Sequence, residues 1–132
     1  MQKMLLGLCL FVMLPNLSGQ LRETGIRVSL TNGNELYSWC QAYKDAARIK
    51  DDGIYFYSKD ASTVSDAGMC MGYVRGIVDS LPAGEEFSPG PHVKLTQYVD
   101  VVFKYLEEHP ESRDRQAAIL VSTSLTQAFP KR

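Results

Sequence analysis

The sequence "DAGMCMGYVRGIVDS" at residues 66–80 carries three glycines, Gly68, Gly72 and Gly76, at intervals of four residues. Because four residues make about one turn of an α-helix, this spacing puts all three glycines on one stripe of a helix. Glycine in a helix interior costs about 1 kcal/mol relative to alanine, so the repeat needs a structural reason. We predict that a neighbouring helix crosses this stripe closer than the usual separation of about 8–10 Å. A contact between two copies of the chain, in a homodimer, is the second interpretation.

The N-terminal residues 1–19 have the layout of a secretory signal peptide, with a positive start, an apolar core and small residues at the end. The apolar run at 4–14 is too short to span a bilayer. We therefore expect cleavage after Gly19 and a mature domain, residues 20–132, that lies in the periplasm with no membrane attachment. A lipoprotein is the alternative, but a leucine precedes Cys9 where a small residue is expected.

Export determines what the cysteines can do, because an oxidising compartment favours disulfides. The mature chain keeps Cys40, on a helical face with Leu36 and Tyr43, and Cys70, on a face with Val74. Two inward-facing cysteines on consecutive helices can meet, so we predict one disulfide between them. A zinc site is disfavoured, because the chain has no Cys-x-x-Cys and both histidines are distant in sequence. A catalytic cysteine is a weaker alternative.

Apolar periodicity and capping signals predict four helices and no sheet. In chain order, the first begins at a capping Asn34 and ends before "KDDG" at 50–53, the second begins at Ser62 or Thr63, the third follows the proline-rich loop 81–91, and the fourth runs from Pro110 to Ala128. The stretch "IYFYS" at 54–58 resembles a strand, but with no evident partner we interpret it as an extended linker or a helical turn that packs Tyr55 and Tyr57 against the core. The predicted fold is a small all-α domain of four helices, or five with a short extra turn, and one disulfide.

Composition and motifs exclude several classes of function. A net charge of −1 argues against a general nucleic-acid binder. The chain contains no nucleophile motif of the Gly-x-Ser-x-Gly kind and no phosphate-binding loop. Cys70 with His92 or His109 could form a thiol–imidazole pair, but a disulfide cysteine and two surface histidines explain these residues better. We therefore expect no enzyme activity, no catalytic residues, no metal and no cofactor.

Three stretches together resemble the Rap/Tai family of type VI secretion immunity proteins. They are "GNELYSWC" at 33–40, "CMGYVRGIVDS" at 70–80 and "YVDVVFKYLEEHPESRDRQAAILVSTSLTQAFP" at 98–130. The resemblance implies an all-helical periplasmic protein that binds and blocks a peptidoglycan amidase toxin and tends to form dimers. It also places a disulfide on Cys40 and Cys70, the pair inferred above from the residues themselves.

The chain departs from this family at a second cysteine pair that many members carry. The corresponding positions here hold Ser88 and Lys131. Both partners are absent together, as expected for a lost bridge, because a single orphan thiol is a liability in an oxidising compartment. The departure raises the question of how the loop 82–91 is tied to the C-terminus.

The loop 82–91 is also the candidate partner-binding segment, through Glu85, Glu86, Phe87 and Ser88. Three prolines stiffen it, and a stiff loop loses less entropy on binding. In this interpretation Phe87 is an apolar anchor beside two carboxylates, although the loop could equally serve only as a connection between helices. The alternative function is a small periplasmic chaperone or stress protein of the same fold without a toxin partner.

Overall fold

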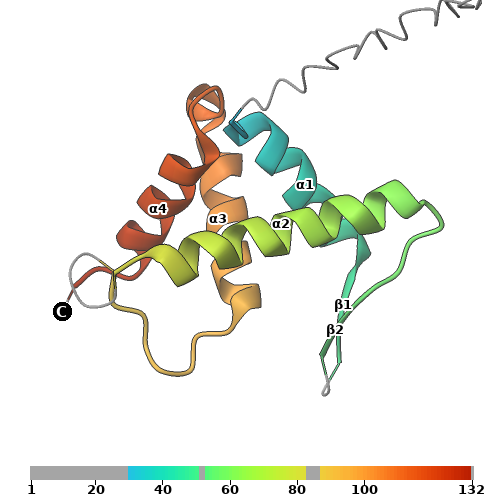
Figure 1. Ribbon diagram of the computed structural model, residues 1–132, viewed down its shortest axis with the longest axis horizontal. Helices are drawn as coiled ribbons and strands as arrows, with labels where there is room; N and C mark the ends of the chain where they lie inside the picture. The colour runs from blue at the N-terminus through green and yellow to red at the C-terminus, as the bar shows by residue number, and fades with distance from the viewer. Residues whose placement is uncertain (1–29, 51–52, 83–86, 132) are drawn as a thin grey trace, which may run out of the picture.

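The computed structural model describes residues 30–50, 53–82 and 87–131. This part of the chain forms four α-helices and a small two-stranded sheet (Figure 1). In order, the elements are α1 (Gly33–Ala46), β1 (Ala47–Lys50), β2 (Gly53–Phe56), α2 (Ala61–Ser80), α3 (Leu95–Glu108), a 3-10 turn (Pro110–Ser112) and α4 (Ala117–Ala128). The prediction of a helical domain is confirmed, and the prediction that it has no sheet is wrong. The expected signal peptide, residues 1–19, lies outside the described residues.

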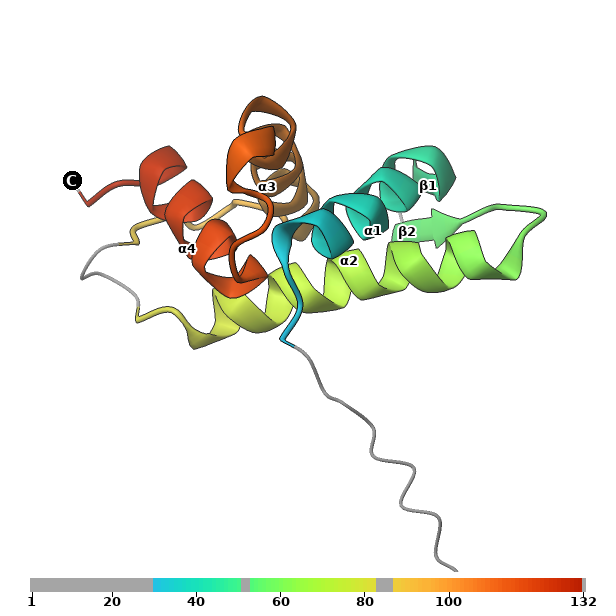
Figure 2. The same ribbon diagram turned by 90° about the horizontal axis from the view of Figure 1, so that it is seen from above.

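The long helix α2 forms one side of the molecule, and α1, α3 and α4 all pack against it (Figure 2). The core lies between α2 and these three helices. Its fully buried side chains are mostly leucines and valines, namely Leu36, Val74, Val99, Val102, Leu106, Leu120, Val121 and Leu125. Burial of each such side chain contributes about 1.5–3 kcal/mol, so the core is the main stabilising element of the fold.

The predicted disulfide between Cys40 of α1 and Cys70 of α2 is confirmed. The two Cα atoms are 5.0 Å apart, and both cysteines are completely buried. Periodicity identified this pair because each cysteine occupies the core-facing side of its helix. The bond links the first two helices at the centre of the core.

The N-terminus of α1 is capped by Asn32, not by Asn34 as the sequence predicted. The Asn32 side chain accepts a hydrogen bond from the Glu35 backbone N–H at 3.0 Å. Two further backbone bonds join this turn to the segment before α4, from Gly33 N–H to the Arg115 carbonyl at 3.0 Å and from Ala117 N–H to the Thr31 carbonyl at 2.8 Å. The start of α1 is therefore fixed to a segment distant in sequence.

The two strands form an antiparallel hairpin directly after α1. Helix α1 ends at Ala46, so residues 47–49, predicted as its last turn, form strand β1 together with Lys50 and become the missing partner of "IYFYS". Lys50 and Gly53 of the sequence "KDDG" pair with each other across the two strands, so this sequence is not a helix stop. Gly53 has a φ of 157°, a backbone conformation that residues with side chains rarely adopt. The hairpin projects from the helices at the end of the molecule opposite α4 (Figure 1).

Helix α2 begins two or three residues earlier than a cap at Ser62 or Thr63 would allow, because Asp60 is its N-cap. The Asp60 carboxylate accepts hydrogen bonds from the Ser62 backbone N–H at 3.0 Å and the Ser62 hydroxyl at 2.9 Å. These bonds lower the pKa of Asp60, the backbone bond more strongly than the side-chain bond. The folded protein therefore favours the ionised form of this carboxyl.

A lowered pKa in the folded state stabilises the protein above the unfolded-state pKa of about 4, and this stability is lost as the pH falls through the folded pKa. We expect the melting temperature to fall below about pH 4, in part through Asp60. Asparagine still caps a helix but cannot titrate, so Asp60→Asn should melt with a weaker pH dependence between pH 2 and pH 5. Thermal melts of both proteins across this range measure the difference, and parallel curves would contradict the role given to Asp60.

Candidate partner-binding surfaces

The loop before α3 does not present the anchor that its sequence suggested. Phe87 is only 4% exposed, and its ring centroid lies 5.9 Å from that of Tyr98 and 6.1 Å from that of Phe129. The prediction of an exposed Phe87 is wrong. Packing of a large aromatic ring against other apolar side chains is more favourable in free energy than its exposure to water. Ser88 is half-buried, and the predicted contacts Glu85 and Glu86 lie outside the described residues.

The same contacts tie this loop to the C-terminus without a second disulfide. The Ser88 backbone N–H donates to the Phe129 carbonyl at 3.0 Å. The rings of Phe87, Tyr98 and Phe129 pack edge to face or tilted on one another beside this bond. A cavity of about 370 Å³ adjoins the junction, lined by Ser88, Gly90, Val93, Ala128, Phe129 and Pro130. Ring packing and one backbone hydrogen bond therefore connect the loop to the C-terminus, where no disulfide joins positions 88 and 131.

The glycine stripe of α2 is not covered by another helix. Gly68, Gly72 and Gly76 are exposed, and a Cβ atom placed on any of them would meet no atom within 4 Å apart from its own chain neighbours and the adjacent backbone of α2. The prediction of close packing inside the domain is therefore wrong. Since the Cys70 side of α2 faces the core, the glycine stripe, which lies between a third and a half of a turn around the helix from Cys70, faces outward. Met69, 48% exposed, lies beside it.

Two substitutions test the use of this stripe. In a monomer, Gly72→Ala should stabilise the protein by up to about 1 kcal/mol, because it removes the cost of glycine in a helix and meets no neighbour. Gly72→Leu should also fold, and it should dissociate any dimer that uses this face. Thermal melts and light scattering after size-exclusion chromatography check both results. Unfolding of either variant would contradict the open environment of Gly72.

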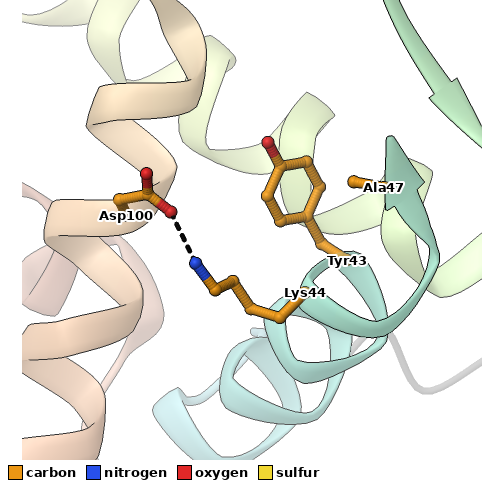
Figure 3. A pocket seen from close by; sticks show the side chains of 4 residues that line it. All are labelled: Tyr43, Lys44, Ala47 and Asp100. Atoms are coloured by element: carbon orange, nitrogen blue, oxygen red, sulfur yellow. Dashed lines mark hydrogen bonds and ion pairs between the residues drawn. The ribbon is translucent and has the colours of Figure 1, made fainter. Parts of the chain in front are cut away.

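A small pocket lies between α1 and α3 and is lined by Tyr43, Lys44, Ala47 and Asp100 (Figure 3). Its volume is about 130 Å³. The Lys44 Nζ atom lies 2.9 Å from Asp100 Oδ1, and this ion pair joins the two helices beside the pocket. Burial, and to a lesser degree the Asp100 carboxylate, raises the pKa of the Tyr43 phenol. The Tyr43 phenol therefore stays neutral. The residues that line the pocket mainly form the contact between α1 and α3.

Stacked cationic and aromatic side chains form a further part of the contact between α1 and α3. The Arg113 guanidinium lies 3.7 Å from the centroid of the Tyr37 ring, which stacks on Phe103 at 5.4 Å with an interplanar angle of 5°. Lys44 lies over Phe103 at 5.9 Å. Arg113 also donates from Nε to the Leu106 carbonyl at 2.6 Å. This hydrogen bond gives a partner to one of the last carbonyl groups of α3. These residues hold α1, α3 and the turn before α4 in fixed positions.

An open groove of about 340 Å³ lies between α3 and α4. Lys104 and Glu108 pair at 3.8 Å along its edge, and the rings of Tyr105 and His109 lie 4.4 Å apart. The predicted surface position of the histidines agrees with this arrangement, since His109 is partly exposed and His92 is exposed. Among the described residues, no group of three or more His, Cys, Asp and Glu side chains could hold a metal ion.

The hairpin presents an exposed aromatic surface, so the prediction that Tyr55 and Tyr57 pack against the core is wrong. Tyr55 is 37% exposed and Tyr57 is 54% exposed, and Lys50 Nζ lies over both rings, at 5.3 and 5.6 Å. The alternation of polar and apolar residues in "ARIK" and "IYFY" was the available signal for this hairpin. It was hidden because "ARIK" also continues the helical pattern that begins at Leu36.

Comparison with known protein families gives a match. The family model for Rap1a immunity proteins matches residues 32–130 of this chain, which spans all the helices and the hairpin. None of the curated protein sequences matches the chain. In the described parts of the chain, no helix is both long and apolar enough to cross a membrane.

Proposed function

This chain belongs to the Rap1a immunity protein family, and we propose that it acts in the periplasm, where it binds and blocks a peptidoglycan amidase toxin delivered by type VI secretion. The observation that carries the proposal is the family match, which covers residues 32–130 and hence the whole described fold. Membership of an immunity family implies a protein toxin as the partner. The amidase class of that toxin follows from the resemblance of the "CMGYVRGIVDS" and "YLEEHPE" sequences to Rap/Tai proteins.

The disulfide supports the periplasmic location. Buried disulfides persist in oxidising compartments and are rare in the cytoplasm, where thiols are kept reduced. Cys40 and Cys70 are joined in the core, and the sequence at 1–19 has the layout of a cleavable export signal. Both features are expected of a protein that meets its toxin at the cell wall.

The proposed mechanism is steric. A rigid domain that covers the active-site cleft of an amidase excludes the peptidoglycan strand without any chemistry of its own. The helices supply the rigidity, through the disulfide and through the Arg113–Tyr37–Phe103 stack. A preorganised surface loses little entropy on binding, which favours a tight complex.

The proposal is tested with an amidase encoded by the reading frame next to this protein's own. We expect the purified domain, residues 20–132, to inhibit peptidoglycan hydrolysis by that enzyme at about one equivalent and to form a stable complex with it. In cells that export the toxin, the full chain should restore growth, whereas a chain without residues 1–19 should not. Undiminished hydrolysis at a large excess of the domain would contradict the function, and rescue by the leaderless chain would contradict the location.

The loop 82–91 has its own test within this function. Deletion of residues 85–88 would also remove the buried Phe87, so charge reversal is the cleaner change. If the loop occupies the cleft, Glu85→Lys with Glu86→Lys should weaken the complex at least about tenfold without lowering the melting temperature. Equal affinities for the variant and the natural chain would reduce the loop to a connection between α2 and α3.

A further inference from the structure

We propose that the outward face of the β1–β2 hairpin, formed by Arg48, Lys50, Tyr55 and Tyr57, is a contact surface for an acidic patch on the protein toxin. This inference rests on the proposed function and names the surface through which it is carried out. It is independent of Phe87 and Ser88, which contact Phe129 at the end of α4, since the hairpin projects from the end of the molecule opposite α4 (Figure 1).

The strand register divides the hairpin into two faces. Ala47 pairs with Phe56 and Arg48 pairs with Tyr55, and side chains directly opposite each other in an antiparallel pair lie on the same face. Ala47, Ile54 and Phe56 are partly buried and pack against the core. The face with Arg48 and Tyr55 therefore points outward.

The inward face fixes the hairpin to the helices. The Phe56 ring packs edge to face on the buried Tyr43, with ring centroids 6.2 Å apart. The Tyr57 backbone N–H donates to the Ala46 carbonyl at 2.9 Å, which extends the strand pairing to the last residue of α1. These contacts fix the position of the hairpin, and with it the backbone that carries the outward side chains, in the unbound protein.

The outward face combines aromatic rings with positive charge. The Tyr55 and Tyr57 rings lie 6.4 Å apart, and the Lys50 ammonium lies over both of them. Arg48 donates from Nη1 to the carbonyls of Asp45 and Ala47, at 3.1 and 2.8 Å, so its guanidinium stays beside the strand. Tyrosine and arginine are enriched at interface hot spots, because they offer a large contact area and a polar end.

Charge decides what kind of partner fits this face. The ion pairs between described residues use Lys44, Arg75, Lys104 and His109 as cations. Neither Arg48 nor Lys50 takes part in any of them. The chain as a whole has a net charge of −1, and the outward face of the hairpin carries the two cations Arg48 and Lys50. Carboxylates on a partner, placed beside an apolar surface for the two rings, would complement it and speed association at low salt.

The experiment measures binding of the amidase described above to the folded domain by isothermal titration calorimetry. Tyr57→Ala and Lys50→Glu should each weaken the complex at least about tenfold. The affinity of the natural domain should fall as salt rises from 50 to 500 mM, and Lys50→Glu should show a shallower dependence. Matched controls at distant exposed positions are Ile119→Ala on α4 and Lys104→Glu on α3, which should stay within about threefold of the natural domain.

The outcomes separate this inference from the proposed function. If the natural domain does not bind the amidase, the proposed function fails and the inference fails with it. If the natural domain binds and both hairpin variants bind equally well, only the inference is overturned. A second copy of the chain is the other possible occupant of this face. If Tyr57→Ala dissociates a dimer and leaves the affinity for the amidase unchanged, the assignment to the toxin is also overturned. Circular dichroism should show every variant folded, since the four altered side chains are exposed.

Discussion

Replacement of both Cys40 and Cys70 by alanine is expected to lower the free energy of unfolding by about 3–4 kcal/mol. The bond closes a loop between residues separated by 30 positions, and release of such a loop raises the entropy of the unfolded chain by this amount in the chain-entropy model. For a domain of this size, the loss corresponds to a fall in melting temperature of about 12–25 °C. Chemical denaturation and thermal melts of the oxidised protein measure both quantities.

Reduction provides a control for this variant within the same experiment. Dithiothreitol should destabilise the natural domain by a similar amount and should leave the double-alanine variant unchanged. The two substitutions also remove buried sulfur atoms, so the variant should be slightly less stable than the reduced natural domain. A melting temperature within about 3 °C of the oxidised natural domain would show that the helices hold together without the bond.

Gly33→Ala is expected to destabilise the protein by about 2 kcal/mol or more, and Gly33→Val by a larger amount. A Cβ atom on Gly33 would overlap the Leu120 side chain and would lie 2.9 Å from both the Cα and the carbonyl oxygen of Arg113. Backbone atoms cannot move aside as a flexible side chain can. The start of α1 would have to separate from this segment, with loss of the bond from Asn34 N–H to the Arg113 carbonyl at 2.9 Å.

Gly72→Ala is the matched control for Gly33→Ala. Both substitutions add one methyl group to a helical glycine, but Gly72 has open space where Gly33 has the backbone of Arg113. The two variants should therefore shift the midpoint of urea denaturation in opposite directions. Equal shifts would show that helix propensity, rather than the contact with Arg113, determines the effect at Gly33.

The two glycine sites show where sequence reasoning reaches its limit. The regular spacing of Gly68, Gly72 and Gly76 suggested close packing, yet these glycines face outward, and the glycine in tight contact is Gly33, which has no repeat to mark it. Spacing along a helix says which residues share a face. It does not say which face is covered, because that depends on where the other helices cross.

The sequence did not predict the hairpin or the packing of Phe87 on Tyr98 and Phe129, for a related reason. The segment "ARIK" fits the end of a helix and a strand equally well, and only its pairing with "IYFY" decides between them. In the same way, Phe87 is apolar in a polar loop, and its burial against Phe129 depends on a residue distant in sequence. Long-range contacts of this kind leave no local periodicity.

The sequence by itself determined the helical class, the core face of each main helix and the partner of each core cysteine. These features follow from local spacing, since a 3.6-residue period turned Leu36, Cys40 and Tyr43 to one side of α1 and Cys70 and Val74 to one side of α2. Only the tertiary structure decided which surfaces are exposed. It turned the glycine stripe and the Tyr55–Tyr57 face outward and the Phe87 ring inward, because exposure is set by contacts between segments far apart in the chain.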